Sequence, residues 1–422
     1  MVKKDGGYGW VLTAMAFFMA FIELGTFKSF GVFLLPIRES LQCSVTTIGT
    51  VMAAAHTTTF MLIPLVNILG KKHGTKVLAV GGGFIMFVCG LGTCLAYNIA
   101  QFSVFVILWG VGVAMSHGPP IVEMLLYFPN NPALPFSIIS SGAGFGMMLC
   151  PPLAEFLIDI YGWRGAMLLF AALSAHICVL GVLIKPSSSA YTALGNGCSR
   201  FQKIEDNDNK LRRCCTLAFK SFCEFLALDV LWYEPKFIIH ALVSFLVGVM
   251  YSAWMIFLVP HAIARGIESQ LASFLSSVGG VGTLLGRIIQ GPVMHRNWIQ
   301  AVQLSTLLAF LNALAFVLDP IISDNYPGLA CLAFVNGLSL GTMAVLFILV
   351  AKQVLSEDLS VQGWGTLLVF FAIGELLGGA LAGLSYDATG SYDISYWILG
   401  GLSGVAVVVL VAERIQNLCC GN

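Results

Sequence analysis

Long apolar stretches recur along the whole chain and restrict what it can fold into. A helix of about 20 apolar residues can cross roughly 30 Å of hydrocarbon. Only 10% of the 422 residues are charged, whereas soluble domains carry about 25%. The sequence therefore predicts an all-α membrane protein with twelve transmembrane helices, at residues 10–34, 46–69, 77–98, 102–127, 136–159, 164–184, 237–259, 270–293, 299–318, 328–350, 360–385 and 395–412.

The expected helices fall into two groups of six, separated by one long polar stretch. We expect residues 1–185 to form an N-terminal six-helix bundle and residues 186–236 a cytosolic linker. Residues 237–422 would form a C-terminal six-helix bundle with a short cytosolic tail. Two bundles around a central path are typical of the major facilitator architecture, in which substrates bind near the midplane.

The distribution of basic residues predicts the orientation. The chain has 21 lysines and arginines. Arg38, Arg164 and Arg265 fall in loops expected outside, and two more lie within spans, which leaves 16 on the inner side. Because cytosolic loops are enriched in Lys and Arg, both termini are expected in the cytosol.

Several functional classes find no support in the sequence. Acidic and basic residues are equal in number, so charge gives no indication of a nucleic-acid partner. The twelve cysteines lack the regular spacing of a disulfide framework or a zinc site. No nucleophile triad, phosphate loop or metal site is recognisable. We therefore expect no cofactor, no metal and no enzymatic activity.

Two basic residues within apolar helices are the strongest indication of function. Lys28 lies deep in the first expected span and Arg287 deep in the eighth. Each costs about 2.5–3.5 kcal/mol on insertion scales, so such residues usually serve a function. The alternatives are a Lys28 side chain that reaches the interface and an Arg287 paired for structure alone. An arginine fork and a lysine point charge in different halves suit a small carboxylate anion.

Buried acids and a histidine are candidates for proton coupling or charge compensation. Glu375, in the eleventh span, could neutralise Arg287 or take up a proton. Glu23 lies five residues before Lys28, about 140° around a helix, so the two do not share a face. His117 precedes a Gly-Pro-Pro sequence and could relay protons. A structural role is the alternative for all three.

Two motifs resemble signatures of the monocarboxylate transporter family, a branch of the major facilitators. Asp5-Gly6-Gly7-Tyr8-Gly9-Trp10 opens the first span as the family's first signature does. Tyr127-Phe128, a helix rich in small residues and then Gly162-Trp163-Arg164-Gly165 are similar to the second. The resemblance extends through all twelve spans.

The resemblance implies roles for particular residues. Phe27-Lys28-Ser29 is similar to a family motif whose lysine is implicated in substrate and proton binding. Gly286-Arg287 matches a motif whose arginine engages the substrate carboxylate. Thr283 stands where proton-coupled members have an aspartate. Pro129-Asn130-Asn131-Pro132 replaces the family's basic cluster and could alter gating on the cytosolic side.

The leading hypothesis is a plasma-membrane carrier of lactate or pyruvate type that works by alternating access, with proton co-transport an open question. A pH-independent facilitative carrier of another carboxylate-bearing solute, such as an amino acid, creatine or a thyroid-hormone-like molecule, is the alternative within transport. A non-transporting membrane sensor or scaffold is the alternative of another class. The resemblance also implies a single-span immunoglobulin-like chaperone as a partner.

Overall fold

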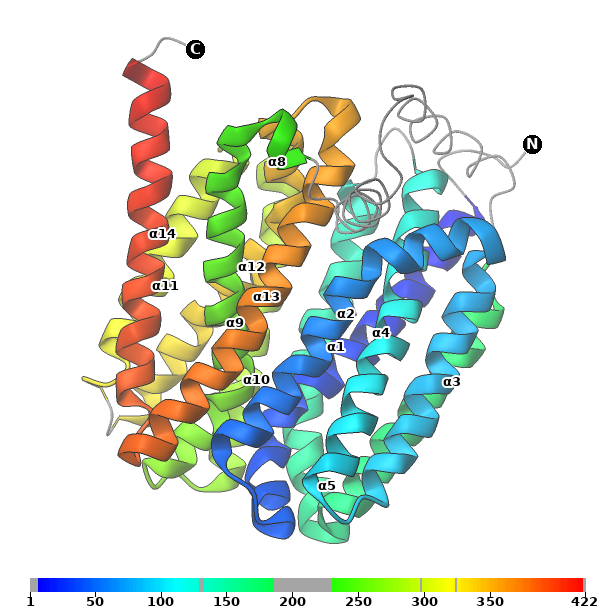
Figure 1. Cartoon of the computed structure of the whole chain (residues 1–422), viewed down its shortest axis with the longest axis vertical. Helices are drawn as coiled ribbons and strands as arrows, with labels where there is room; N and C mark the ends of the chain where they lie inside the picture. Colours follow the sequence, from blue (N-terminus) through cyan, green and yellow to red (C-terminus); the bar gives the residue numbers. More distant parts are fainter. Residues whose placement is uncertain (1–6, 129–132, 186–229, 297, 323–324, 420–422) are drawn as a thin grey trace, which may run out of the picture.

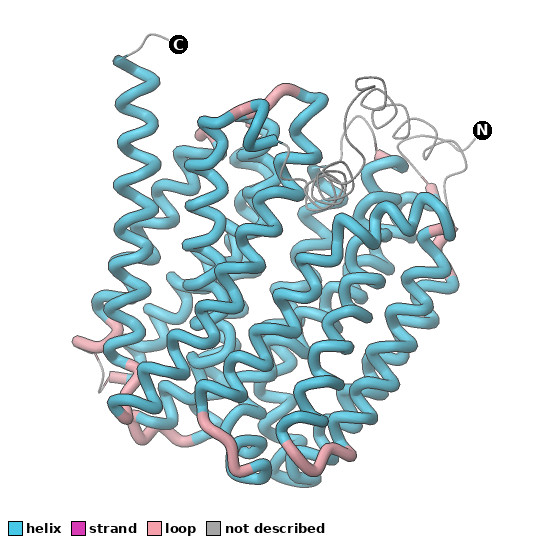
Figure 2. The backbone as a smooth tube through the Cα atoms, in the orientation of Figure 1, coloured by secondary structure: helices cyan, strands magenta, loops and turns pink. Residues whose placement is uncertain are grey.

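The computed structural model describes residues 7–128, 133–185, 230–296, 298–322 and 325–419. Every regular element in these ranges is a helix, as the sequence predicts (Figures 1 and 2). The elements are α1 (Tyr8–Leu41), α2 (Val45–His73), α3 (Thr75–Cys94), α4 (Ile99–Tyr127), α5 (Ala133–Val182), α8 (Val230–Tyr233), the 3-10 turn η2 (Pro235–Phe237), α9 (Ile238–Ala264), α10 (Ser269–His295), α11 (Ala301–Leu318), α12 (Tyr326–Val354), α13 (Glu357–Thr389) and α14 (Asp393–Cys419).

Within the described residues, 11 helices are long and apolar enough to cross a membrane. The longest, α5, has 50 residues but is broken at Gly162, whose φ of 68° and ψ of 171° are not helical. A straight helix of that length would measure about 75 Å, well over twice the hydrocarbon thickness. Gly162 therefore divides α5 into the two spans that the sequence predicts as the fifth and sixth.

The helices pack in two groups with a shared interface. In the N-terminal half α5 packs against α1 and α3, and α4 against α2 and α3. In the C-terminal half α13 packs against α9, α10 against α12, and α11 against α12 and α14. The halves meet where α2 contacts α13, α5 contacts α10 and α1 contacts α9. Much of the predicted linker, residues 186–229, lies outside the described residues, so the domain boundaries stay a prediction.

The start of α1 and the end of α14 lie at the same end of the molecule, which we call the terminal side (Figure 1). An even number of spans requires this arrangement.

The two signature motifs of the N-terminal half meet at the terminal side. The Trp10 ring packs edge-on against Phe128, with ring centroids 5.1 Å apart. A Cβ atom on Gly9 would lie 2.8 Å from the Phe128 ring, so the glycine permits the contact. The Tyr8 hydroxyl donates to the carbonyl of Leu183, near the end of the sixth span. The motifs thus join the ends of the first, fourth and sixth spans.

The end of the second signature forms the turn at the opposite side. Arg164 follows the break at Gly162 and donates from Nε to the Cys94 carbonyl at 3.2 Å. Its Nη2 donates to the Ala96 carbonyl at 2.7 Å. The last carbonyls of a helix lack partners within it, and Arg164 satisfies one at the end of α3 and another just after it. This motif therefore fixes the fifth and sixth spans against the third.

Close backbone contact between α1 and α5 depends on glycine. A Cβ atom on Gly146 would lie 2.2 Å from the Phe21 carbonyl oxygen, and one on Gly25 would lie 3.0 Å from the backbone of Gly146. Small residues allow such approach in membrane helices, where packing and not hydrophobic exclusion joins the helices. The α1–α5 contact positions the N-terminal half of the cavity described below.

We expect Gly146→Ala to lower the stability of the folded protein by about 1–3 kcal/mol, because the added methyl group overlaps backbone atoms. Gly401→Ala is the control, since a Cβ atom there meets nothing within 4 Å. Thermal unfolding of both variants in detergent, followed by tryptophan fluorescence, measures the difference. Equal melting temperatures would contradict this description of the α1–α5 contact.

Candidate functional site

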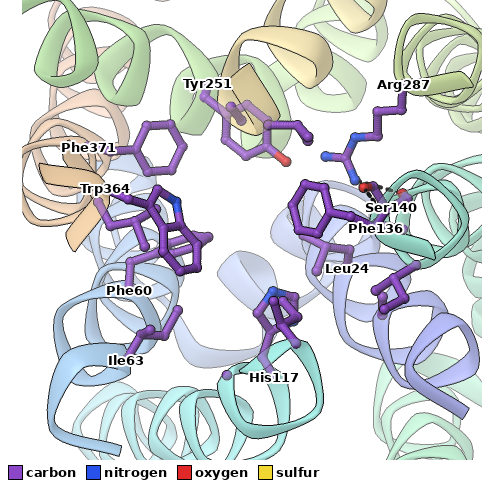
Figure 3. Close-up of a pocket in the computed structure, with 18 residues that line it drawn as sticks. Leu24, Phe60, Ile63, His117, Phe136, Ser140, Tyr251, Arg287, Trp364 and Phe371 are labelled. Atoms are coloured by element: carbon purple, nitrogen blue, oxygen red, sulfur yellow. Dashed lines mark hydrogen bonds between the residues drawn. The ribbon is translucent and has the colours of Figure 1, made fainter. Parts of the chain in front are cut away.

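A cavity of about 110 Å³ lies between the two halves. Helices α1, α2, α4 and α5 contribute one wall, and α9, α10, α12 and α13 the other (Figure 3). The eighteen lining residues are Ala20, Leu24, Phe60, Ile63, His117, Gly118, Ile121, Phe136, Ile139, Ser140, Ala143, Tyr251, Arg287, Ala344, Val345, Trp364, Leu368 and Phe371. A concave site at the interface of two bundles is the expected position for a carrier's ligand.

The cavity wall is apolar and aromatic, with few polar groups. Five aromatic rings face it, namely Phe60, Phe136, Tyr251, Trp364 and Phe371 (Figure 3). The charged and titratable side chains in the wall are those of His117, Tyr251 and Arg287. Such a lining suits a ligand with one anionic group and an apolar remainder.

Arg287 connects the two halves at one side of the cavity. Its Nη1 donates to the Ser140 carbonyl of α5 at 2.9 Å. Its Nε donates to the Gly341 carbonyl of α12 at 3.2 Å. The side chain is 7% exposed, and no carboxylate in the described ranges forms an ion pair with it. A guanidinium has five N–H donors, so donors remain for an anion.

The Tyr251 hydroxyl points toward the same guanidinium (Figure 3). Tyr251 belongs to α9, so both groups come from the C-terminal half. A hydroxyl can donate to an anion that the arginine attracts. The two side chains together form a polar end to an otherwise apolar cavity.

Thr283 does not face the cavity. Its hydroxyl donates to the Gly337 carbonyl of α12 at 2.9 Å. One turn later, Arg287 also bonds to an α12 carbonyl, so this face of α10 is held against α12 at two levels. An aspartate is absent at this position, and Arg287 consequently lacks a counter-charge on its own helix.

His117 lies in the wall opposite Arg287 (Figure 3). Its Nδ1 is 2.7 Å from Oε2 of Glu23 on α1. The other carboxylate oxygen, Oε1, accepts a hydrogen bond of 2.6 Å from the Ser116 hydroxyl. The Glu23 side chain is fully buried and that of His117 is 21% exposed. Glu23 therefore lies behind His117, and the imidazole is the member of the pair that borders the cavity.

Lys28 lies beyond the cavity, on the side away from the termini. Leu24 lines the cavity and Lys28 follows one helical turn later on α1. The Lys28 ammonium is 3.2 Å from the Trp254 carbonyl and 3.4 Å from the Met255 carbonyl, both on α9. It also lies 3.6 Å above the centre of the Trp254 ring. These contacts join α1 of one half to α9 of the other.

Glu375 lies at the same level and pairs with a histidine. Its Oε1 is 2.6 Å from Nδ1 of His56 on α2, and both side chains are buried. The Phe27 ring stacks on the imidazole at 3.8 Å. We call the group formed by Lys28, His56, Trp254 and Glu375 the inter-half layer, because its contacts connect the two halves beyond the cavity.

The structure brings some of the predicted site residues together and separates others. Arg287 and His117 line one cavity, with Glu23 directly behind His117. Lys28 does not line it, and the expected neutralisation of Arg287 by Glu375 is replaced by the pair of Glu375 with His56. Of the first signature, Asp5 and Gly6 lie outside the described residues, whereas Gly7 and Trp10 lie at the terminal side, away from the cavity.

The aromatic wall and Tyr251 did not emerge from the sequence. The chain has 30 phenylalanines, 11 tyrosines and 8 tryptophans, and nothing in their spacing indicates which face the cavity. His56 lacks a neighbouring acid in the sequence, so its pairing with Glu375 is also a finding of the structure. In the described part of the chain, no group of three or more His, Cys, Asp or Glu could hold a metal ion.

Comparison with known proteins identifies the family. Residues 16–360 match the family model described as "Major Facilitator Superfamily". Similar proteins include monocarboxylate transporter 12 of Xenopus laevis, 24% identical over 96% of this chain and 88% of that protein. Human monocarboxylate transporter 11 is 26% identical over 99% of this chain and 85% of that protein. Bovine monocarboxylate transporter 13 is 24% identical over 96% of this chain and 89% of that protein. The chain therefore belongs to the Major Facilitator Superfamily and is a membrane carrier, not an enzyme, and its similarity to monocarboxylate transporters agrees with the resemblance of its motifs.

Proposed function

We propose that the protein carries a monocarboxylate across the membrane by alternating access, with Arg287 holding the carboxylate. The observation that supports this most strongly is a buried guanidinium in the cavity wall with no carboxylate partner among the described residues. Arginine binds carboxylates through two parallel hydrogen bonds. A substrate carboxylate would supply the missing counter-charge, and the Tyr251 hydroxyl lies where it can donate a further hydrogen bond.

The aromatic rings in the cavity wall indicate how large the apolar part of the substrate could be. Lactate or pyruvate, the substrates that the sequence predicts, would fill the polar end formed by Arg287 and Tyr251. The five aromatic rings favour a second candidate within transport, namely a monocarboxylate with a larger apolar or aromatic body. Burial of an aromatic ring contributes about 25 cal/mol per Å² of apolar surface, which small hydroxy acids cannot use.

Alternating access would open and close the inter-half layer. Lys28 bonded to α9 and His56 bonded to Glu375 hold the two halves together on one side of the cavity, so these contacts must break when the cavity opens to that side. In this conformation we assign Lys28 to closing the layer and not to direct contact with substrate. The cytosolic position of the termini, the plasma membrane and the immunoglobulin-like chaperone stay predictions of the sequence.

Replacement of Arg287 by lysine should lower pyruvate uptake into proteoliposomes by about tenfold or more. Lysine cannot form the two parallel bonds of arginine, and a lost hydrogen bond to a charged group costs about 1.5–3 kcal/mol. Arg296→Lys is the matched control, because Arg296 directly follows the same helix and is exposed. Arg287→Lys with unimpaired uptake would refute the carboxylate assignment.

A ligand panel separates the candidate substrates. We expect phenylpyruvate to raise the melting temperature of the purified protein more than pyruvate or L-lactate at equal concentration, because its ring can occupy the aromatic part of the cavity. Methyl pyruvate, which lacks the carboxylate, should have no effect. Stabilisation by phenylpyruvate without uptake would favour the sensor hypothesis, and stronger stabilisation by lactate would favour the smaller substrates.

Glu375→Gln should lower uptake by about tenfold or more, or reduce the amount of carrier at the cell surface. The change replaces the carboxyl group that pairs with His56 across the interface, and the carrier must return to this conformation in every cycle. Glu413→Gln is the control, since Glu413 pairs with His240 at 3.1 Å within the C-terminal half. Normal surface expression together with normal, pH-dependent uptake would count against this role for Glu375.

A further inference from the structure

We propose that the Glu23–His117 pair binds the proton that is co-transported with the carboxylate. This inference rests on the proposed function and adds the coupling ion and its binding site. It assigns coupling to the N-terminal half, in the wall opposite Arg287, and not to the helix that carries the arginine.

The geometry gives the pair a proton-binding atom at the cavity. Nδ1 of His117 is occupied by Glu23 at 2.7 Å, so Nε2 is the ring nitrogen left for the cavity. Glu23 is itself held in place by the Ser116 hydroxyl at 2.6 Å. Histidine is the side chain that most commonly gains or loses a proton near neutral pH.

The charges around the cavity couple this proton to an anionic ligand. With a neutral His117, the positive charge of Arg287 and the negative charge of Glu23 balance in the empty cavity. A bound carboxylate adds one negative charge, and a proton on His117 restores the balance. Uncompensated charge is costly in a medium of low dielectric constant. Carboxylate and proton therefore each favour the binding of the other.

The titratable and charged groups that share the cavity wall with His117 are Tyr251 and Arg287. The residues that face it from the packed helices are Met86 of α3, Phe60 and Ile63 of α2, and Ile139 and Ser140 of α5, none of which titrates near neutral pH. Tyr251 and Arg287 face it across the cavity. Lys28 and Glu375 lie one helical turn deeper, in the inter-half layer, and do not line the cavity.

The main alternative proton-binding site is the His56–Glu375 pair. It has a comparable N–O distance of 2.6 Å, but both of its side chains are buried, at 4% and 0% exposed. Neither residue lines the cavity, and the pair joins the two halves. Protonation there would act on the closure of the inter-half layer, whereas protonation of His117 acts beside the ligand itself.

Thr283 bears on whether α10, the helix of Arg287, could bind the proton in place of the Glu23–His117 pair. Its hydroxyl is committed to the Gly337 carbonyl, so the helix of Arg287 offers no proton acceptor near the guanidinium. Glu23 and His117 supply an acid and a base in the facing wall instead. The proposed anion site at Arg287 and the proposed proton site at His117 would then face each other across the cavity and would not lie one turn apart on the same helix.

The test is titration calorimetry of phenylpyruvate binding to the purified full-length carrier in two buffers of different ionisation enthalpy. The ligand is fully ionised at neutral pH, so any proton taken up binds to the protein. We expect about one proton per ligand for the wild type, and an affinity that rises up to about tenfold for each unit of falling pH. His117→Gln and Glu23→Gln should still bind phenylpyruvate through Arg287, but with little proton uptake and a flat pH dependence.

Two controls complete the experiment. His240→Gln removes a histidine from a His–Glu pair away from the cavity and should retain full proton uptake. His56→Gln should also retain it. Binding to the wild type without proton uptake, or loss of uptake in His56→Gln but not in His117→Gln or Glu23→Gln, would overturn the assignment. Should His117→Gln fail to fold, Glu23→Gln decides. If neither phenylpyruvate nor pyruvate binds the wild type, the proposed function itself fails, and this inference with it.

Discussion

The burial of a guanidinium between two helical bundles is the constraint on which the site depends. Arg287 is bonded to a carbonyl of α5 on one side and to a carbonyl of α12 on the other. Removal of such a charge from water costs several kcal/mol unless it is compensated. Carbonyl oxygens satisfy part of its hydrogen-bonding capacity but carry no net charge. The missing counter-charge is the observation that supports our proposal of a carboxylate site at Arg287.

The rest of the fold positions that arginine against the N-terminal half. Glycine contacts bring α1 against α5, and α5 in turn presents Ser140 to the guanidinium. On the far side of the cavity, the inter-half layer connects the halves through a few polar contacts from Lys28 and His56. A few directional bonds can be exchanged for others during a conformational change, whereas a continuous apolar interface would resist separation. A layer of this kind suits a carrier that alternates between two states.

The sequence predicted the architecture more completely than the site. Membrane insertion requires each span to be long and apolar, so hydropathy alone locates the spans, and even the break at Gly162 falls between two of the predicted ones. The cost of buried charge likewise identifies Arg287, Glu23 and Glu375 as individual candidates, but it does not indicate what each of them contacts. Their partners depend on which helices are neighbours, and a single sequence does not contain that information. Glu375 was expected near Arg287 and lies instead against His56, whereas Glu23 lies beside His117.

The most direct measurement of the central claim is a structure of the carrier with 4-bromobenzoate, in which anomalous scattering locates the bromine atom. The account predicts the carboxylate within hydrogen-bonding distance of Arg287, with the bromine among the aromatic rings of the cavity. A carboxylate bound elsewhere, with Arg287 still bonded only to the carbonyls of Ser140 and Gly341, would contradict it.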